Sequence, residues 1–156
     1  MQVLLAAGGS PLSWLIRRLT KEDASHIALS WGGYVLHSNL FGVHWESLES
    51  FKKRDSIVEE LAIGEDVTKL LLFSISLAGK AKYDFLGLLY CGLRLALRGI
   101  GIHLPKKNLW AITGMYLCTE LVSLYTEGMA DDLSSPRKLF DQLKEEKCSK
   151  ESPQPS

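Results

Sequence analysis

Apolar and polar side chains alternate along residues 26–31, with an apolar residue at every second position. This period of two predicts a β-strand with one face in the core. Gly32-Gly33 separates this strand from residues 34–38, and a loop of two glycines predicts a hairpin because a type I′ turn needs a positive φ at both positions. Residues 41–47 predict a third strand.

Helical patterns with a period near 3.6 cover most of the remaining chain. Helix-starting signals, such as Ser10 before Pro11, stand at the beginning of several of these segments. The predicted helices are residues 11–19, 66–77, 84–97 and 116–127, followed by an amphipathic helix from Pro136. Residues 84–97 are apolar on nearly all sides, so we expect that helix to be largely buried. Strands in the first third and helices after them predict an α+β domain, with helices packed on an antiparallel sheet.

Composition places the chain among ordinary globular domains. It has 156 residues, of which 46% are hydrophobic, and predicts a single domain over residues 1–146. Residues 147–156 contain no aliphatic or aromatic side chain, so we expect a disordered tail there. The 18 Lys and Arg residues balance the 18 Asp and Glu residues. A net charge of zero gives no electrostatic attraction to nucleic acid or to an anionic membrane, and we expect neither as a partner.

The sequence also bears on compartment. The longest stretch without Asp, Glu, Lys or Arg, residues 24–45, contains histidine, glycine, serine and asparagine, which excludes a membrane span. Residues 3–7 are too short for the core of a signal peptide and lack a basic flank. Cys91, Cys118 and Cys148 are an odd number without close pairing, which is typical of a reducing compartment. We therefore expect a cytoplasmic protein without stable membrane insertion.

The predicted hairpin brings two histidines to one face of the sheet. Pairing that is symmetric about the two glycines sets Ala28 opposite His37 and makes His26 a diagonal neighbour of His37. Their β-carbons are then about 7–8 Å apart, within reach of a shared polar network. Alternatively, each imidazole is simply an amphipathic side chain near a sheet edge. Two histidines without acidic or cysteine residues at ligand spacing are a weak metal signature, so we expect no metal.

Cys118 stands where a helical pattern begins. Backbone N–H groups at a helix N-terminus favour the thiolate and lower the pKa of a cysteine from about 8.5. Because the thiolate is the nucleophile, a nearby imidazole would complete an activated pair. The alternative is that Cys118 is a small buried hydrophobic residue, as we expect for Cys91 within its apolar helix.

Three blocks of sequence resemble a known superfamily: residues 20–29 (TKEDASHIAL), Tyr83-Asp84, and residues 116–122 (YLCTELV) with Gly128. They are similar to the circularly permuted branch of the NlpC-type papain-like cysteine hydrolases. That branch includes YiiX-like proteins and lecithin:retinol acyltransferase-like enzymes. Residues 8–16 (GGSPLSWLI) are similar to the start of short bacterial and phage-encoded members. A phage-encoded member would be released from the host by lysis.

The resemblance implies a circularly permuted papain-like fold and assigns roles to particular residues. Cys118 matches the nucleophile, His26 the general base, and His37 the residue that orients the base. The third position is acidic in many YiiX-like members, whereas a second histidine there resembles the acyltransferase-like branch. Tyr116 is a candidate oxyanion donor beside the backbone N–H of Cys118, and core packing is its alternative role.

The implied function is hydrolysis of an amide bond through a thioester, without any cofactor. The expected substrate is a small peptide, or a peptidoglycan fragment of the stem-peptide type. Two alternatives stay open. One is hydrolysis or transfer of a lipid acyl group, and the other is a non-catalytic binding module with the same fold.

Overall fold

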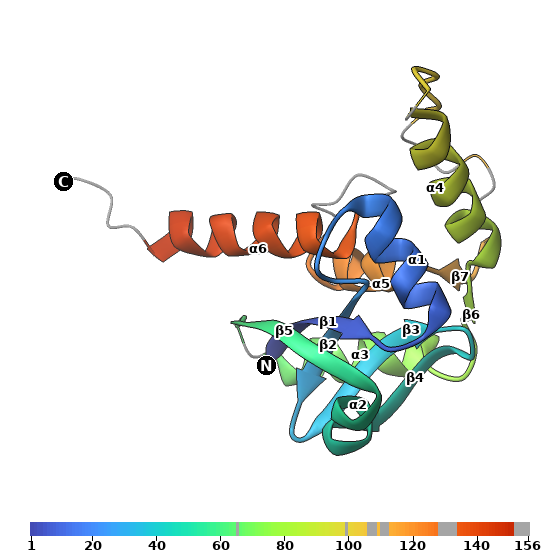
Figure 1. Cartoon of the computed structure of the whole chain (residues 1–156). Helices are drawn as coiled ribbons and strands as arrows, with labels where there is room; N and C mark the ends of the chain where they lie inside the picture. Colours follow the sequence, from blue (N-terminus) through green and yellow to red (C-terminus); the bar gives the residue numbers. More distant parts are fainter. Residues whose placement is uncertain (65, 99, 106–108, 110–112, 128–133, 152–156) are drawn as a thin grey trace.

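The structure is a computed structural model that describes residues 1–64, 66–98, 100–105, 109, 113–127 and 134–151. It confirms the α+β class. Its described part holds six helices and a five-stranded antiparallel sheet in the order β4-β3-β2-β1-β5 (Figure 1). Gly128 and residues 152–156 lie outside the described residues.

Three strands of the sheet agree with the sequence pattern: β2 (His26–Trp31), β3 (Tyr34–Asn39) and β4 (Gly42–Ser47). The β2–β3 turn has φ values of 58° at Gly32 and 83° at Gly33, as a type I′ turn requires. The other two strands of this five-stranded sheet were not predicted, namely β1 (Gln2–Gly8) and β5 (Asp55–Ala62). Because β1 is an inner strand with both faces covered, its apolar residues form a continuous run and lack the alternation that reveals a half-buried strand.

The helices that were predicted appear as α1 (Pro11–Thr20), α3 (Val67–Leu77), α4 (Phe85–Arg98), α5 (Cys118–Tyr125) and α6 (Pro136–Glu151). A short helix, α2 (Leu48–Arg54), was not predicted. The Ser10 side chain accepts a hydrogen bond from the Ser13 N–H, so α1 begins at the expected cap. Since α6 continues to Glu151, residues 147–151 are helical and do not belong to the expected tail.

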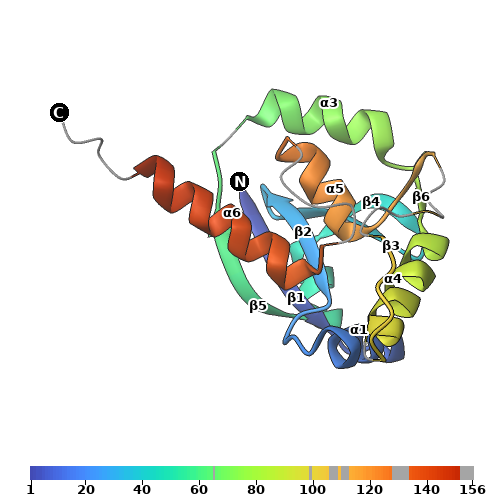
Figure 2. The same cartoon turned by 90° about the horizontal axis from the view of Figure 1, so that it is seen from above.

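The sheet has two differently covered faces. The side that we call the α5 face carries Ile27 and Leu29 and is covered by α5 and α6 (Figure 2). The side that we call the α2 face carries Ala28 and Val35, which pack against Phe51 of α2. In Figure 1, α2 lies on the opposite side of the sheet from α5 and α6. Side chains of successive residues in β2 therefore enter two separate environments.

The expectation that residues 84–97 are largely buried is wrong. Of the residues in α4, only Gly87 and Tyr90 are buried, whereas Phe85 is 51% exposed. The helix packs beside α1 rather than on the sheet, with Leu19 against Gly92 (Figures 1 and 2). An all-round apolar composition does not determine how many neighbours a helix has. No helix in the described part of the chain is long and apolar enough to cross a membrane.

Two short strands and the last helix position the segments around the site. Strands β6 (Lys82–Tyr83) and β7 (Met115–Tyr116) pair in parallel, which sets the starts of α4 and α5 side by side. The first turn of α6 holds the segment before β2. Ser135 Oγ donates a hydrogen bond to Glu22 Oε1 at 2.6 Å, and Arg137 forms an ion pair with Asp23 at 2.6 Å.

Candidate active site

His26 and His37 meet on the α2 face, as the hairpin geometry predicted. The pairs Leu29–Leu36 and Ser30–Val35 give the register that is symmetric about the two glycines. His26 Nε2 lies 2.9 Å from His37 Nδ1, and the two ring planes are nearly perpendicular, at 82°. The Phe51 ring of α2 packs against both imidazoles. This prediction is confirmed.

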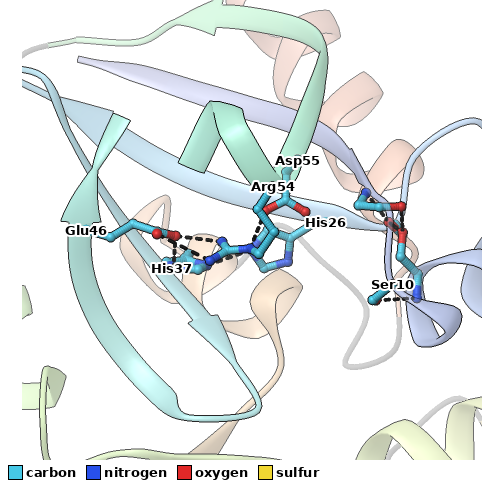
Figure 3. A network of polar contacts seen from close by, with 9 residues as sticks. Ser10, His26, His37, Glu46, Arg54 and Asp55 are labelled. Carbon is cyan, nitrogen blue, oxygen red and sulfur yellow. Dashed lines mark hydrogen bonds and ion pairs between the residues drawn. The ribbon is translucent and has the colours of Figure 1, made fainter. Parts of the chain in front are cut away.

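Glu46 of β4 extends this pair into a chain of three side chains. Its Oε1 lies 2.8 Å from His37 Nε2, at ion-pair distance but without the direction of a linear hydrogen bond (Figure 3). A carboxylate only accepts, so we assign the His37 proton to Nε2. His37 Nδ1 then accepts from the N–H at His26 Nε2, and His26 Nδ1 keeps its lone pair. We call this chain the Glu46–His37–His26 relay.

Arg54, the last residue of α2, holds the outer end of the relay. Its Nη2 donates to Glu46 Oε1 at 2.6 Å, its Nη1 donates to Oε2 at 3.3 Å, and its Nε donates to Asp55 Oδ2 at 2.8 Å (Figure 3). The guanidinium therefore fixes the carboxylate bidentately. His37, which is fully buried, is thus held between His26 and Glu46, and the Glu46 carboxylate is held between His37 and Arg54.

Burial keeps both imidazoles neutral. It is the largest cause that lowers the pKa of His26 from 6.5 to about 4, and the positive charge of Arg54 adds to the effect. Burial also lowers the pKa of His37, and the neighbouring His26 and His44 lower it further. At neutral pH, His26 consequently offers a lone pair that can accept a proton.

A cleft with a volume of about 280 Å³ lies beside the relay, and both His26 and His37 line it. One part of its wall is polar and contains serine, asparagine, aspartate and arginine side chains, and another part is apolar. The lining residues are Gly9, Ser10, Leu12, Ser13, Ile16, Ser25, His26, His37, Ser38, Asn39, Leu40, Phe41, Arg54, Asp55 and Tyr83. The relay thus ends at a space that a small ligand can enter.

Cys118 is the first residue of α5, as expected, but its thiol is buried on the α5 face. The side chain is only 8% exposed. Backbone N–H groups of Ile27, Thr119 and Cys118 itself favour the thiolate, yet burial outweighs them and raises the pKa of Cys118 to about 11. The expected lowering of this pKa is therefore wrong. A helix pattern gives the position of a thiol along the helix but not its depth in the core.

The structure brings the two histidines together but leaves Cys118 apart from them. In the described part of the chain, Cys118 has no hydrogen bond to His26 or His37. Its sulfur faces the backbone N–H of Ile27, the residue that follows His26. The thiol thus approaches β2 from the α5 face, at the residue next to His26, whereas the His26 side chain lies on the α2 face. Tyr83 links the two regions, because it lines the cleft and also lies near Cys118: burial raises the pKa of Tyr83, and the charge that a Cys118 thiolate would carry raises it further.

Tyr116 lies in β7, and its side chain packs against the core of the α5 face. Its carbonyl oxygen accepts a hydrogen bond from Ser38 Oγ at 2.7 Å, which ties β3 to the start of α5. Tyr83, its partner in the β6–β7 pair, is the tyrosine that lines the cleft. This packing agrees with the alternative role of Tyr116, which is that of a core residue.

No model of a protein family matches this chain, and no curated protein matches it either.

Several residues of the site were not found from the sequence. Alternation within residues 41–47 places His44 and Glu46 on one face, but the Leu40-Phe41 turn carries no signature that fixes the register with β3. The structure pairs His37 with His44, and their ring centroids are 4.5 Å apart, so His44 lies beside the relay. Arg54 belongs to an unpredicted helix, and no signal in the sequence pointed to it.

Metal ligation is limited by Arg54. His37, His44 and Glu46 each present a donor atom, and these atoms lie within 4.8 Å of one another. Imidazole and carboxylate donors suit zinc and related ions. Both oxygens of Glu46 are already hydrogen-bonded to Arg54, however, so a cation at this position would compete with the guanidinium.

Proposed function

We propose that the protein is a cysteine-dependent hydrolase of amide bonds, in which Cys118 is the nucleophile, His26 the general base and His37 the group that orients the base. The observation that supports this most directly is the Glu46–His37–His26 relay, which ends at the cleft with a neutral imidazole. A strand-borne histidine that precedes a cysteine at the start of a helix also fits a circularly permuted papain-like fold.

In this mechanism, His26 Nδ1 takes the proton from Cys118 Sγ while the sulfur attacks the carbonyl carbon of the substrate. The carbon–nitrogen bond breaks, the amine leaves with the proton from His26, and a thioester remains on Cys118. A water molecule then gives a proton to His26 and attacks the thioester. The carboxylic acid leaves, and the proton returns to the sulfur.

The two pKa values determine the resting state. With Cys118 near 11 and His26 near 4, both groups are neutral at pH 7, so proton transfer accompanies the attack. The mechanism further requires that the Cys118 side chain turns from the α5 face toward the cleft at the start of β2. Ser38 and Tyr83, which line the cleft, are the neighbours on that path.

The polar part of the cleft favours a peptide substrate. The oxygens of Ser10 and Asn39 accept backbone N–H groups, which leaves the Ser10 hydroxyl and the Asn39 amide to donate to the carbonyl oxygens of a short peptide or of a peptidoglycan stem peptide. A lipid acyl substrate is the second candidate, because Leu12, Ile16 and Phe41 line the apolar part of the same cleft. The buried, protonated thiol favours a third candidate, a binding module that uses the cleft without catalysis.

Turnover of a panel of stem-peptide fragments, peptide amides and acyl esters tests the proposal. We expect Cys118→Ala to abolish turnover of the best substrate and His26→Ala to reduce it by about 10²–10⁴-fold. His37→Ala should retain more activity, and His37→Gln should recover part of the loss. The matched controls are Cys148→Ala and His103→Ala, since both residues are exposed. Mass spectrometry should detect the acyl group on Cys118.

Full turnover in Cys118→Ala would refute the thiol mechanism. Saturable binding of a peptide without turnover, lost when the cleft residue Phe41 is changed to Asp, would support the binding module instead. Cleavage of acyl esters but not of amides would assign the lipid substrate.

A further inference from the structure

Three donor side chains from β3 and β4 gather on the α2 face. His37, His44 and Glu46 each bring one ligand atom, and these atoms lie within 4.8 Å of one another. His37 and His44 are paired across the two strands, and Glu46 lies two residues further along β4, on the same face. Donor atoms around a tetrahedral zinc ion are about 3.3 Å apart, since each lies about 2.0–2.1 Å from the metal. Small side-chain movements therefore suffice to bring all three onto one ion.

The hydrogen bonds of the two imidazoles leave one nitrogen of each for a metal. His44 Nδ1 lies 3.1 Å from the carbonyl oxygen of Gly42, which only accepts, so Nδ1 carries the proton and Nε2 the lone pair. Histidines that bind a metal usually donate their other N–H to a carbonyl or a carboxylate in this way. His37 Nε2 is buried and makes no linear hydrogen bond, although Glu46 Oε1 is 2.8 Å away. In each imidazole, Nε2 is therefore the nitrogen that a cation can bind.

Arg54 competes for Glu46, but it has a second partner. Its Nη2 donates to Glu46 Oε1 at 2.6 Å, whereas its Nε donates to Asp55 Oδ2 at 2.8 Å (Figure 3). The Arg54 side chain is 49% exposed, so water can hydrate an N–H group that leaves Oε1. A cation on Oε1 thus displaces one hydrogen bond of the guanidinium, while the bonds to Oε2 and to Asp55 can persist. Two carboxylates beside one guanidinium also favour a cation electrostatically.

We propose that His37, His44 and Glu46 form a site for zinc or a related divalent transition metal ion, and that the bound ion prevents His26 from accepting a proton. Two imidazoles and a carboxylate suit these ions, whereas Mg²⁺ prefers oxygen ligands in an octahedral arrangement. Three protein ligands leave the fourth position to water. His44 and Glu46 are partly exposed, so the ion can enter from solvent.

The effect on His26 follows from where the protons go. Metal binding at His37 Nε2 requires that this nitrogen loses its proton to solvent. His37 Nδ1 then takes the proton of His26 Nε2, and His26 Nδ1 takes up a proton from water. His26 Nδ1 consequently has no lone pair for the Cys118 thiol. This inhibition rests on the proposed function, whereas the metal site does not.

Isothermal titration calorimetry of the full chain with Zn²⁺ tests the site. We expect one tight zinc ion per chain and no comparable binding of Mg²⁺. His44→Gln should weaken zinc binding by at least about 100-fold, because loss of a direct ligand costs more than the roughly 10–100-fold that is typical of an outer-shell partner. The matched control is His103→Gln, which removes an exposed histidine and should bind zinc as tightly as the parent.

Titration with Co²⁺ identifies the ligands in the parent protein, so the test stands even if circular dichroism shows that a variant does not fold. We expect the visible bands of four-coordinate nitrogen and oxygen ligation, without the strong near-ultraviolet band of a thiolate ligand. Zinc binding that His44→Gln leaves unchanged, or a thiolate band in the parent, would overturn the site.

Turnover of the substrate panel separates the metal site from the proposed function. Zinc should inhibit the parent, and His44→Gln should need at least about 100-fold more zinc for the same inhibition. Zinc binding without inhibition would overturn the effect on His26. Absence of turnover in the metal-free protein would instead refute the hydrolase, and the metal site would stand on calorimetry alone.

Discussion

The two faces of the β2–β3 hairpin place reactive groups in environments that shift their pKa values in opposite directions. On the α2 face, His26 and His37 are buried together with Glu46, and each imidazole has a polar partner. On the α5 face, Cys118 is buried among apolar side chains, and its thiol is held in the protonated form. Burial keeps the groups of both sites neutral at pH 7, because it lowers the pKa of the two histidines and raises the pKa of the cysteine.

The contrast arises because successive side chains along a strand point to opposite faces of the sheet. His26 and Ile27 are adjacent in sequence, but one enters the relay and the other contacts Cys118. Strand geometry alone therefore determines which of the two environments a side chain meets. Any reaction that uses both Cys118 and His26 therefore requires one of these side chains to reach the other face of the sheet.

The largest effect concerns thiol reactivity. At pH 7.5 we expect iodoacetamide to label Cys118 at least about 100-fold more slowly than the exposed Cys148, because burial both shields the sulfur and raises its pKa. Mass spectrometry of timed samples measures both rates. In guanidinium chloride the two rates should converge. Faster labelling of Cys118 in the native protein would remove the contrast between the two faces.

The next effect concerns the stability of the relay. Glu46→Ala should lower the free energy of unfolding by about 2–3 kcal/mol, because it leaves the buried Nε2 of His37 without a carboxylate and removes one of the two carboxylates that Arg54 binds. The matched control is Glu49→Ala on α2, whose exposed ion pair with Lys53 contributes less than about 0.5 kcal/mol. Urea unfolding measures both variants. Equal losses would show that the relay does not stabilise the α2 face.

The pH dependence of stability tests the neutral histidines. Between pH 6.5 and 4 the unfolded chain binds a proton at His26 that the folded chain does not, so stability falls as the pH falls. We expect a loss of about 2 kcal/mol between pH 7 and pH 5 from this group. His26→Gln should reduce the slope in urea titrations, whereas His103→Gln should keep it. An unchanged slope in His26→Gln would show that a group other than His26 takes up the proton on unfolding.

The smallest expected effect concerns the charge of Glu120, which lies near the Cys118 thiol. The carboxylate of Glu120 accepts the Leu117 N–H at 2.7 Å and raises the pKa of the neighbouring thiol. Glu120→Gln keeps an acceptor for this N–H but removes the charge. We expect labelling of Cys118 to accelerate by roughly threefold, since loss of the charge lowers the pKa of the thiol and raises its thiolate fraction. Glu145→Gln, on the exposed side of α6, should leave the rate unchanged.

Local signals predicted one half of the site and failed for the other half. The pairing of His26 with His37 could be derived because two glycines fix both the turn type and the register of the hairpin. The Leu40-Phe41 turn has no such signature, so Glu46 stayed unassigned. The depth of Cys118 and the exposure of α4 depend on which elements pack against them, and a helical pattern does not contain this information.

The contacts of α6 also constrain the order in which the site is completed. Glu22 and Asp23, just before His26, are held by Ser135 and Arg137, which follow them by 113 and 114 residues. During synthesis the ribosome makes the histidines early and these partners late. The β2–β3 hairpin can therefore pair while the chain is still growing, but the segment that leads into His26 becomes fixed only after α6 has left the ribosome.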